Sequence, residues 1–178
     1  MKSNKTVVIF LIKFFGAYAL LFAIYSFYLS KNQQTGNYFA CAPVTKNVAV
    51  QTQFVLNALG YEAEIEQHLS ELTIKLFLNK QYVARIFEGC NAVSIIILFI
   101  AFIIAFAGKF KTTLLYILFG SLIIYVVNIV RIALISIAIY EYPEYEKLLH
   151  DAVFPAIIYG ITFLLWFVWI KKFSMSKK

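Results

Sequence analysis

The apolar residues of this chain gather into four long runs that are separated by polar segments. The runs cover residues 6–29, 92–107, 114–140 and 153–170. A helix needs about 20 apolar residues to cross a hydrocarbon core of roughly 30 Å. Three runs approach or exceed that length, whereas the second must take a turn from its flanks or lie where the bilayer is thin. The pattern predicts an all-α polytopic membrane protein with about four transmembrane helices.

We expect the whole chain, residues 1–178, to form a single integral membrane domain. The predicted order is transmembrane helices at 6–29, 90–107, 114–140 and 153–170, outward-facing segments at 30–89 and 141–152, a cytoplasmic loop at 108–113, and a basic cytoplasmic tail at 171–178.

The distribution of charge predicts the orientation. Short loops rich in Lys and Arg stay on the cytoplasmic side, and lysines without acidic neighbours lie before the first run, between the second and third, and after the fourth. All nine acidic residues lie within 62–88 or 141–151. Both termini and the middle loop should therefore be cytoplasmic, and the two acidic segments should face outward.

Composition supports the membrane assignment. Hydrophobic residues make up 62% of the chain and its mean hydropathy is +0.79, well above ordinary soluble domains. The net charge of +7 is then mostly a consequence of topology, since nucleic-acid binding would need the basic residues on one solvated face.

The outward-facing segment 30–89 is predicted to contain an amphipathic helix. Residues 44–60 place apolar side chains at helical spacing and end at Gly60, a usual helix stop. The apolar positions that carry this prediction are Val48, Phe54, Val55, Leu56 and Leu59.

A β-hairpin is predicted further along the same segment. The stretches LTIKLFL and QYVARIF flank Asn79 and Lys80, and the first of them alternates apolar and polar residues. This alternation is typical of a strand with one buried face, and two polar residues between such stretches indicate a tight turn.

A cysteine stands at the start of the second apolar run, in the sequence Glu88-Gly89-Cys90. If the thiol lies in the first helical turn, unpaired backbone N–H groups and the helix dipole should lower its pKa below the free value of about 8.5. A more ordinary interpretation remains open, because buried cysteine is often a small hydrophobic packing residue.

An arginine lies inside the third run. Arg131 is about nine residues from the outer end of that run, or roughly 13 Å of helix, and Asn128 is one turn earlier on the same face. An arginine at such a depth normally faces protein or water. The pair predicts a polar notch that opens outward.

His150 closes the acidic outer loop and precedes the fourth run. Cys90, Arg131 and His150 thus belong to the outer ends of three helices that short connections must hold together. A thiol, a histidine and a fixed cation are the groups that thiol-dependent acyl transfer requires.

The motifs E-x-C, N-x-x-R and a His before the last span, here Glu88 to Cys90, Asn128 to Arg131 and His150, resemble the exosortase/archaeosortase family. The resemblance covers about residues 82–170 and is greatest to the compact exosortase F branch. Many relatives follow the cysteine with Ser-Gly, whereas this chain has Asn91-Ala92.

The resemblance implies a membrane-embedded cysteine protease or transpeptidase in the bacterial cytoplasmic membrane, with its active site facing outward. Its partners would be exported proteins whose C-terminal sorting signal has a short motif, a transmembrane helix and a basic tail, together with membrane lipids and a lipid or glycan acceptor. It implies Cys90 as nucleophile, His150 as general acid and base, and Arg131 as the oxyanion or thiolate partner, supported by Glu88 and Asn128.

Two other classes compete with this interpretation. Cys41 and Cys90 could serve a four-helix thiol oxidoreductase or form a structural disulfide, although no C-x-x-C pair is present. A scaffold or small transporter without enzymatic activity is the third class. No cofactor motif or cluster of metal ligands is predicted, and no nucleic-acid partner is expected.

Overall fold

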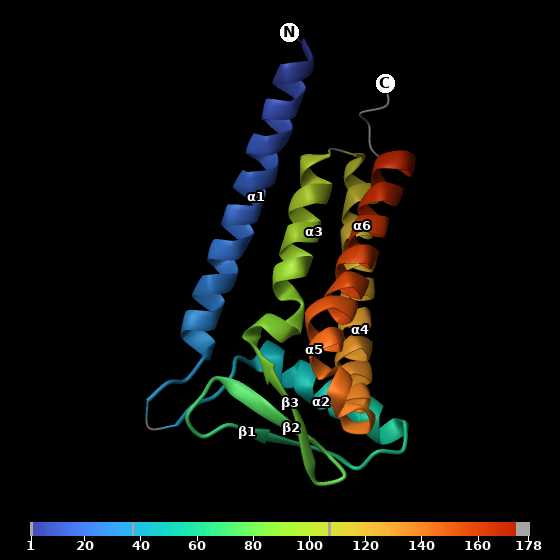
Figure 1. Cartoon of the computed structure of the whole chain (residues 1–178). Coiled ribbons are helices and arrows are strands. Elements are labelled where there is room, and N and C mark those ends of the chain that lie inside the picture. The colour runs from blue at the N-terminus through green and yellow to red at the C-terminus, as the bar shows by residue number, and fades with distance from the viewer. Residues whose placement is uncertain (1, 37, 107, 174–178) are drawn as a thin grey trace.

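The computed structural model describes residues 2–36, 38–106 and 108–173, and for residues 2–4, 150 and 154 it describes the backbone alone. Four helices run side by side, and a smaller layer lies across one end of them (Figure 1). The four helices are α1 (Lys2–Asn32), α3 (Val93–Ala105), α4 (Phe110–Glu141) and α6 (Phe154–Lys172).

The smaller layer consists of helix α2 (Pro43–Ala58) and an antiparallel sheet (Figure 1). The start of α1 and the end of α6 both lie at the opposite end of the molecule. The layer of α2 and the sheet is formed by residues of segment 30–89, which the sequence predicts to face outward. We call it the outer layer.

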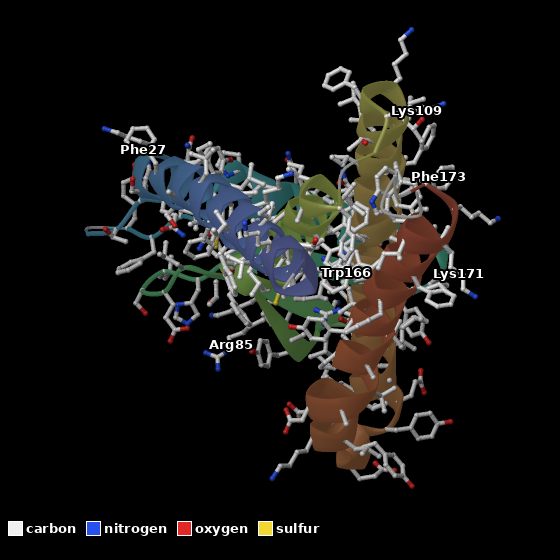
Figure 2. All side chains as sticks on the ribbon, turned by 90° about the horizontal axis from the view of Figure 1, so that it is seen from above. Phe27, Arg85, Lys109, Trp166, Lys171 and Phe173 are labelled. Carbon is white, nitrogen blue, oxygen red and sulfur yellow. The ribbon has the colours of Figure 1, made fainter. Side chains whose placement is uncertain are left out.

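Three parts of the described chain are long and apolar enough to cross a membrane: Lys5–Asn32, Phe110–Glu141 and Pro143–Lys172. Helix α3 is apolar but has only 13 residues, which is about 20 Å at 1.5 Å per residue. It lies between α1 on one side and the pair α4 and α6 on the other (Figures 1 and 2).

The sheet has one strand more than the predicted hairpin. Strands β2 (Thr73–Leu78) and β3 (Gln81–Phe87) pair antiparallel around Asn79 and Lys80, whose φ angles of 49° and 67° are those of a tight hairpin turn. Strand β1 (Ala63–Gln67) adds to the other edge of β2. Its sequence AEIEQ has few apolar residues, and therefore the pattern did not predict it.

Helix α2 forms where it was predicted, but its buried face differs. The buried residues recur every three or four positions and are Thr45, Val48, Ala49, Thr52 and Leu56. Two of the apolar positions on which the prediction depended, Phe54 and Leu59, are 74% and 56% exposed. Small and polar residues fill the contact face because α2 is held tightly between the sheet and α4.

One face of α4 packs against the layer of α2 and the sheet. At 32 residues α4 is about 48 Å long, well beyond a bilayer core of roughly 30 Å. Ile132 packs with Val48 of α2 and Ile86 of β3, and Ala133 packs with Leu76 of β2. At the level of Arg131, one face of α4 therefore packs against α2 and the sheet, while Val130 and Leu134 are 43% and 49% exposed.

Labelling of single cysteines tests the orientation. In a background without Cys41 and Cys90, a membrane-impermeant maleimide should modify Ser70→Cys in intact cells and leave Thr112→Cys unmodified. Ser70 is exposed in the outer layer, and Thr112 lies at the opposite end of the helices. Permeabilised cells supply the control, since both positions should then react. Modification of position 112 in intact cells would contradict the orientation.

Candidate active site

Cys90 lies in a short 3-10 turn, Glu88–Asn91, that joins β3 to α3. Ala92 follows in the left-handed conformation, with φ at 63°, and separates the turn from the helix. The thiol is therefore presented before α3 begins, and not in the first turn of that helix as the sequence had indicated. Cys90 is partly buried and packs against a cluster formed by the outer layer and α4.

The expected lowering of the thiol pKa is wrong for this conformation. Burial raises the pKa of Cys90, whereas a backbone hydrogen bond with Phe87 and the charge of Arg131 lower it, and burial has the largest effect. Burial therefore accounts for the direction of the shift, and Cys90 lies outside the first turn of α3, to which helix-terminal stabilisation is confined. In this state the thiol is largely neutral at pH 7, so thiolate formation requires a proton acceptor.

Helix α4 contributes two polar residues to the Cys90 turn. The side-chain amide of Asn128 is buried, and its Nδ2 donates a hydrogen bond to the backbone oxygen of Cys90 at 2.7 Å. Arg131 is one turn further along the same helix and interacts electrostatically with the Cys90 thiol. The face of α4 that carries the N-x-x-R motif therefore fixes the backbone of the turn and places a cation near its sulfur.

The guanidinium of Arg131 retains unused hydrogen-bonding capacity. Its Nε is buried and has no hydrogen-bond partner within the part of the chain that the structure describes. Its other electrostatic neighbour is Tyr159 of α6. A buried donor without a partner is costly. Such a group beside a thiol is suited to receive an oxygen that gains negative charge during a reaction.

Glu88 does not act on the thiol directly. Its Oε1 accepts a hydrogen bond from the backbone N–H of Ala42 at 2.7 Å, and its Oε2 accepts one from the Thr45 hydroxyl. Both donors belong to the start of α2, where unpaired N–H groups and the helix dipole favour a carboxylate. Glu88 thereby attaches the Cys90 turn to the N-terminus of α2.

Asn91 is a buried polar residue that the sequence analysis did not select. Its side chain, 1% exposed, donates to Tyr25 of α1 at 2.7 Å and to Thr45 of α2 at 3.0 Å, with a longer contact to Glu88 at 3.4 Å. Its Oδ1 accepts the N–H of Val93 at the start of α3. The only indication in the sequence was an amide side chain directly after the cysteine. Its role could not be predicted because its partners are 46 and 66 positions away in sequence.

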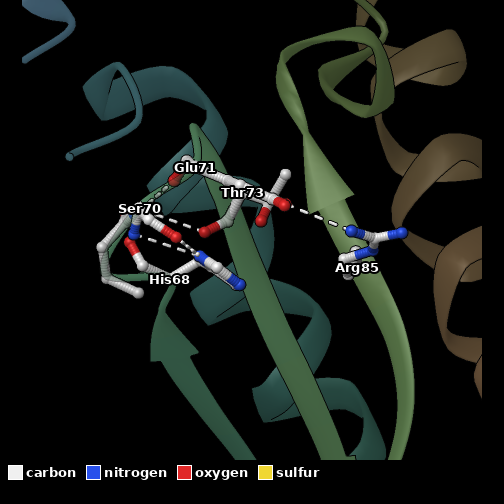
Figure 3. Close-up of polar contacts among 6 residues, drawn as sticks. His68, Ser70, Glu71, Thr73 and Arg85 are labelled. Atoms are coloured by element: carbon white, nitrogen blue, oxygen red, sulfur yellow. Dashed lines mark hydrogen bonds and ion pairs between the residues drawn. The ribbon is translucent and has the colours of Figure 1, made fainter. Parts of the chain in front are cut away.

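The position of the His150 side chain lies outside what the structure describes. The backbone of His150 lies in a π-helical turn, Leu149–Val153, that leads into α6. The other histidine, His68, lies in the turn between β1 and β2, where its Nδ1 accepts the backbone N–H of Ser70 at 3.2 Å (Figure 3). Close by, Arg85 and Glu71 form an exposed ion pair at 3.1 Å. His68 is thus held by its own turn.

The second cysteine is near the first, but the two are not bonded. Cys41 is buried in the cluster against which Cys90 packs, and both thiols are free. Burial and, to a smaller extent, the charge of Glu88 raise the pKa of Cys41 to about 11, although a hydrogen bond from Gln67 acts in the opposite direction. The Cys41 thiol is therefore protonated at neutral pH, and its surroundings are those of a packing residue.

Replacement of Cys41 separates a single-thiol enzyme from a dithiol oxidoreductase. Cys41→Ala should retain most of the activity, because the lost sulfur is a small buried group away from the Asn128 and Arg131 contacts. Mass spectrometry of the wild-type protein without reductant should find Cys90 as a free thiol. A stoichiometric crosslink between Cys41 and Cys90 in active protein would contradict the single-thiol assignment.

The fold and this site define a class: an integral membrane protein of packed helices, with a thiol and an arginine brought together beside an outer layer. Residues 6–170 match the transmembrane exosortase family. The chain belongs to that family, whose members are generally cysteine-type transpeptidases or proteases of the membrane. Neither a curated protein nor a solved structure shows significant similarity to the chain.

Proposed function

We propose that this protein is a cysteine transpeptidase or protease that cleaves the C-terminal sorting signal of exported proteins through a thioester. Exosortases act on exported proteins with such signals. The observation that carries the proposal is the hydrogen bond from Asn128 of α4 to the Cys90 backbone, one turn before Arg131, whose charge lowers the pKa of the Cys90 thiol. A cation and a thiol in a partly buried site suit acyl transfer.

The first half of the reaction forms a thioester. A substrate anchored by its own C-terminal helix reaches the outer interface, and the Cys90 sulfur attacks the carbonyl carbon of the scissile peptide. The thiol proton is taken by His150 and is then given to the leaving amine. The C–N bond breaks, and the helical tail departs with a new amino terminus.

The second half transfers the acyl group. Water yields a cleaved protein with a free carboxylate, whereas an amine or hydroxyl on a lipid or glycan carrier yields an anchored product. In each case the acceptor loses a proton and the Cys90 sulfur regains one. Arg131 stabilises the oxyanion of both tetrahedral intermediates.

The proposed topology places this chemistry outside the bacterial cytoplasmic membrane, with both termini in the cytoplasm. Helix α3 is the fourth crossing in this topology. The compact outer layer then covers the Cys90 turn from the outside and leaves the lipid side of the helices for the substrate helix. We assign the protein to the compact exosortase F branch on the motifs Glu88 to Cys90 and Asn128 to Arg131, and the family match is compatible with that branch.

Substitution of Arg131 tests the proposed role of its guanidinium. Arg131→Lys should lower sorting-signal cleavage by about 10²- to 10³-fold, the usual effect of losing an oxyanion donor, because an ammonium lacks the fork of donors. Arg131→Gln should in addition raise the pH midpoint of Cys90 alkylation, because the charge of Arg131 lowers the pKa of that thiol.

Arg85→Lys is the matched control, since Arg85 forms an exposed ion pair in the outer sheet. It should leave cleavage and alkylation unchanged. Full cleavage by correctly inserted Arg131→Lys would contradict the oxyanion role. An unchanged alkylation midpoint in Arg131→Gln would contradict the charge interaction with the thiol.

A further inference from the structure

One polar cluster attaches the Cys90 turn to helices α1 and α2. Tyr25 of α1, Thr45 of α2, and Glu88 and Asn91 of the turn form this cluster, which we call the Asn91 clamp. Asn91 and Thr45 are 1% and 0% exposed. The Asn91 amide donates to the Thr45 hydroxyl, which in turn donates to the Glu88 carboxylate, so the bonds form a chain with one direction.

The orientation of the Asn91 amide is fixed by its neighbours. Oδ1 accepts the Val93 N–H at 3.0 Å, and Nδ2 donates to the Tyr25 and Thr45 hydroxyl oxygens and lies 3.4 Å from Glu88 Oε2, a carboxylate oxygen that can only accept. A flipped amide would place oxygen against the carboxylate and leave the Val93 donor unpaired. The clamp therefore selects one conformation of the turn that carries the thiol.

The hydrogen bond between Asn91 and Tyr25 connects α1 to the Cys90 turn. Toward its N-terminal end α1 packs on α3 through aromatic side chains, with Phe10 and Phe106 ring centroids 4.5 Å apart. At its other end the Tyr25 hydroxyl accepts the shortest hydrogen bond of the Asn91 amide. A shift of α1 at this end would reach Cys90 through a single intervening residue.

We propose that Asn91 is a positioning residue for the Cys90 nucleophile, and that α1, through the Tyr25 hydroxyl, is part of the machinery that holds the thiol in its reactive position. The cleavage half of this proposal rests on the proposed function. The part that concerns the position of the thiol is independent of the proposed function, because the reactivity of Cys90 can be measured without any sorting substrate.

The two readouts should move in opposite directions. Without the clamp the turn loosens and the thiol becomes more solvated, which relieves the burial that raises its pKa. Alkylation of Cys90 by N-ethylmaleimide at pH 7 should then become several-fold faster, with a lower pH midpoint. Cleavage should fall by about tenfold in Tyr25→Phe and about 10²-fold in Asn91→Ala, since small misplacements of a reacting group are costly.

A double-mutant cycle isolates the route through Asn91. If Tyr25 acts on the thiol only by way of Asn91, the double variant Tyr25→Phe/Asn91→Ala should cleave no more slowly than Asn91→Ala alone. Tyr18→Phe is the matched control, because it removes a hydroxyl from the same helix at a ring that stacks on Phe14 and Phe22. It should change neither readout.

All measurements use full-length protein in membranes, with Cys41→Ala as the background so that the reagent reports on Cys90 and with the amount of inserted protein determined for each variant. Tyr25→Phe retains the aromatic ring, and it provides the test of the clamp if Asn91→Ala does not insert into the membrane. Unchanged alkylation in inserted Tyr25→Phe, or parallel loss of alkylation and cleavage, would overturn the positioning role. Altered alkylation without any sorting-signal cleavage in the parent protein would support the clamp and contradict the proposed function.

Discussion

Cys90→Ala is expected to abolish sorting-signal cleavage and leave exported substrates with an uncut C-terminal helix and basic tail. Thioester formation has no route without the sulfur, so the residual rate should be below about one part in 10⁴. The substitution removes one partly buried atom and retains the backbone oxygen that Asn128 binds. Intact-mass analysis of exported proteins from cells that carry only the variant measures the effect.

Cys41→Ala is the control for this experiment, because it removes the same atom from a buried position nearby. The amount of each variant in the membrane must be equal to that of the wild type. Normal processing by correctly inserted Cys90→Ala would show that the thiol is a packing residue, and the sorting-enzyme proposal would then be wrong.

His150→Ala is expected to lower cleavage by about 10²- to 10⁴-fold, the range of general acid and base catalysis. The requirement is strong here because burial raises the pKa of the Cys90 thiol, so that little thiolate exists at pH 7 without a proton acceptor. Activity in His150→Ala should also rise with pH as more thiolate forms without assistance.

His68→Ala supplies the comparison, since His68 is engaged with Ser70 in the outer sheet. It should cleave at the wild-type rate. If His68→Ala and His150→Ala were equally active, another group would have to remove the thiol proton, and the assignment of His150 would fail.

The sequence could predict those features that depend on local patterns. Apolar runs indicated the positions of the helices, and Asn79 with Lys80 marked the hairpin turn found between β2 and β3. The N-x-x-R spacing placed Asn128 and Arg131 on one face, and that face meets the Cys90 turn. These predictions succeed because each depends on residues within a few positions of one another.

Features that depend on tertiary packing could not be read from the pattern. Strand β1 has few apolar residues, and it is identified by its antiparallel pairing with β2 and not by its own sequence pattern. The pKa of Cys90 was expected to be low because the thiol was placed in the first turn of α3. Cys90 instead lies in a turn before Ala92 and α3, where burial raises the pKa. Asn91 could not be identified as a hub because Tyr25 and Thr45 reach it from distant parts of the chain.

Capture of the thioester tests the central claim most directly. Purified full-length protein would be incubated with a membrane-anchored substrate that carries a sorting signal, quenched in acid, and its peptides analysed by mass spectrometry. We predict that the N-terminal part of the substrate is attached to Cys90 and is released by neutral hydroxylamine. Cleaved product without an adduct on Cys90, or an adduct on Cys41 in its place, would contradict the proposal.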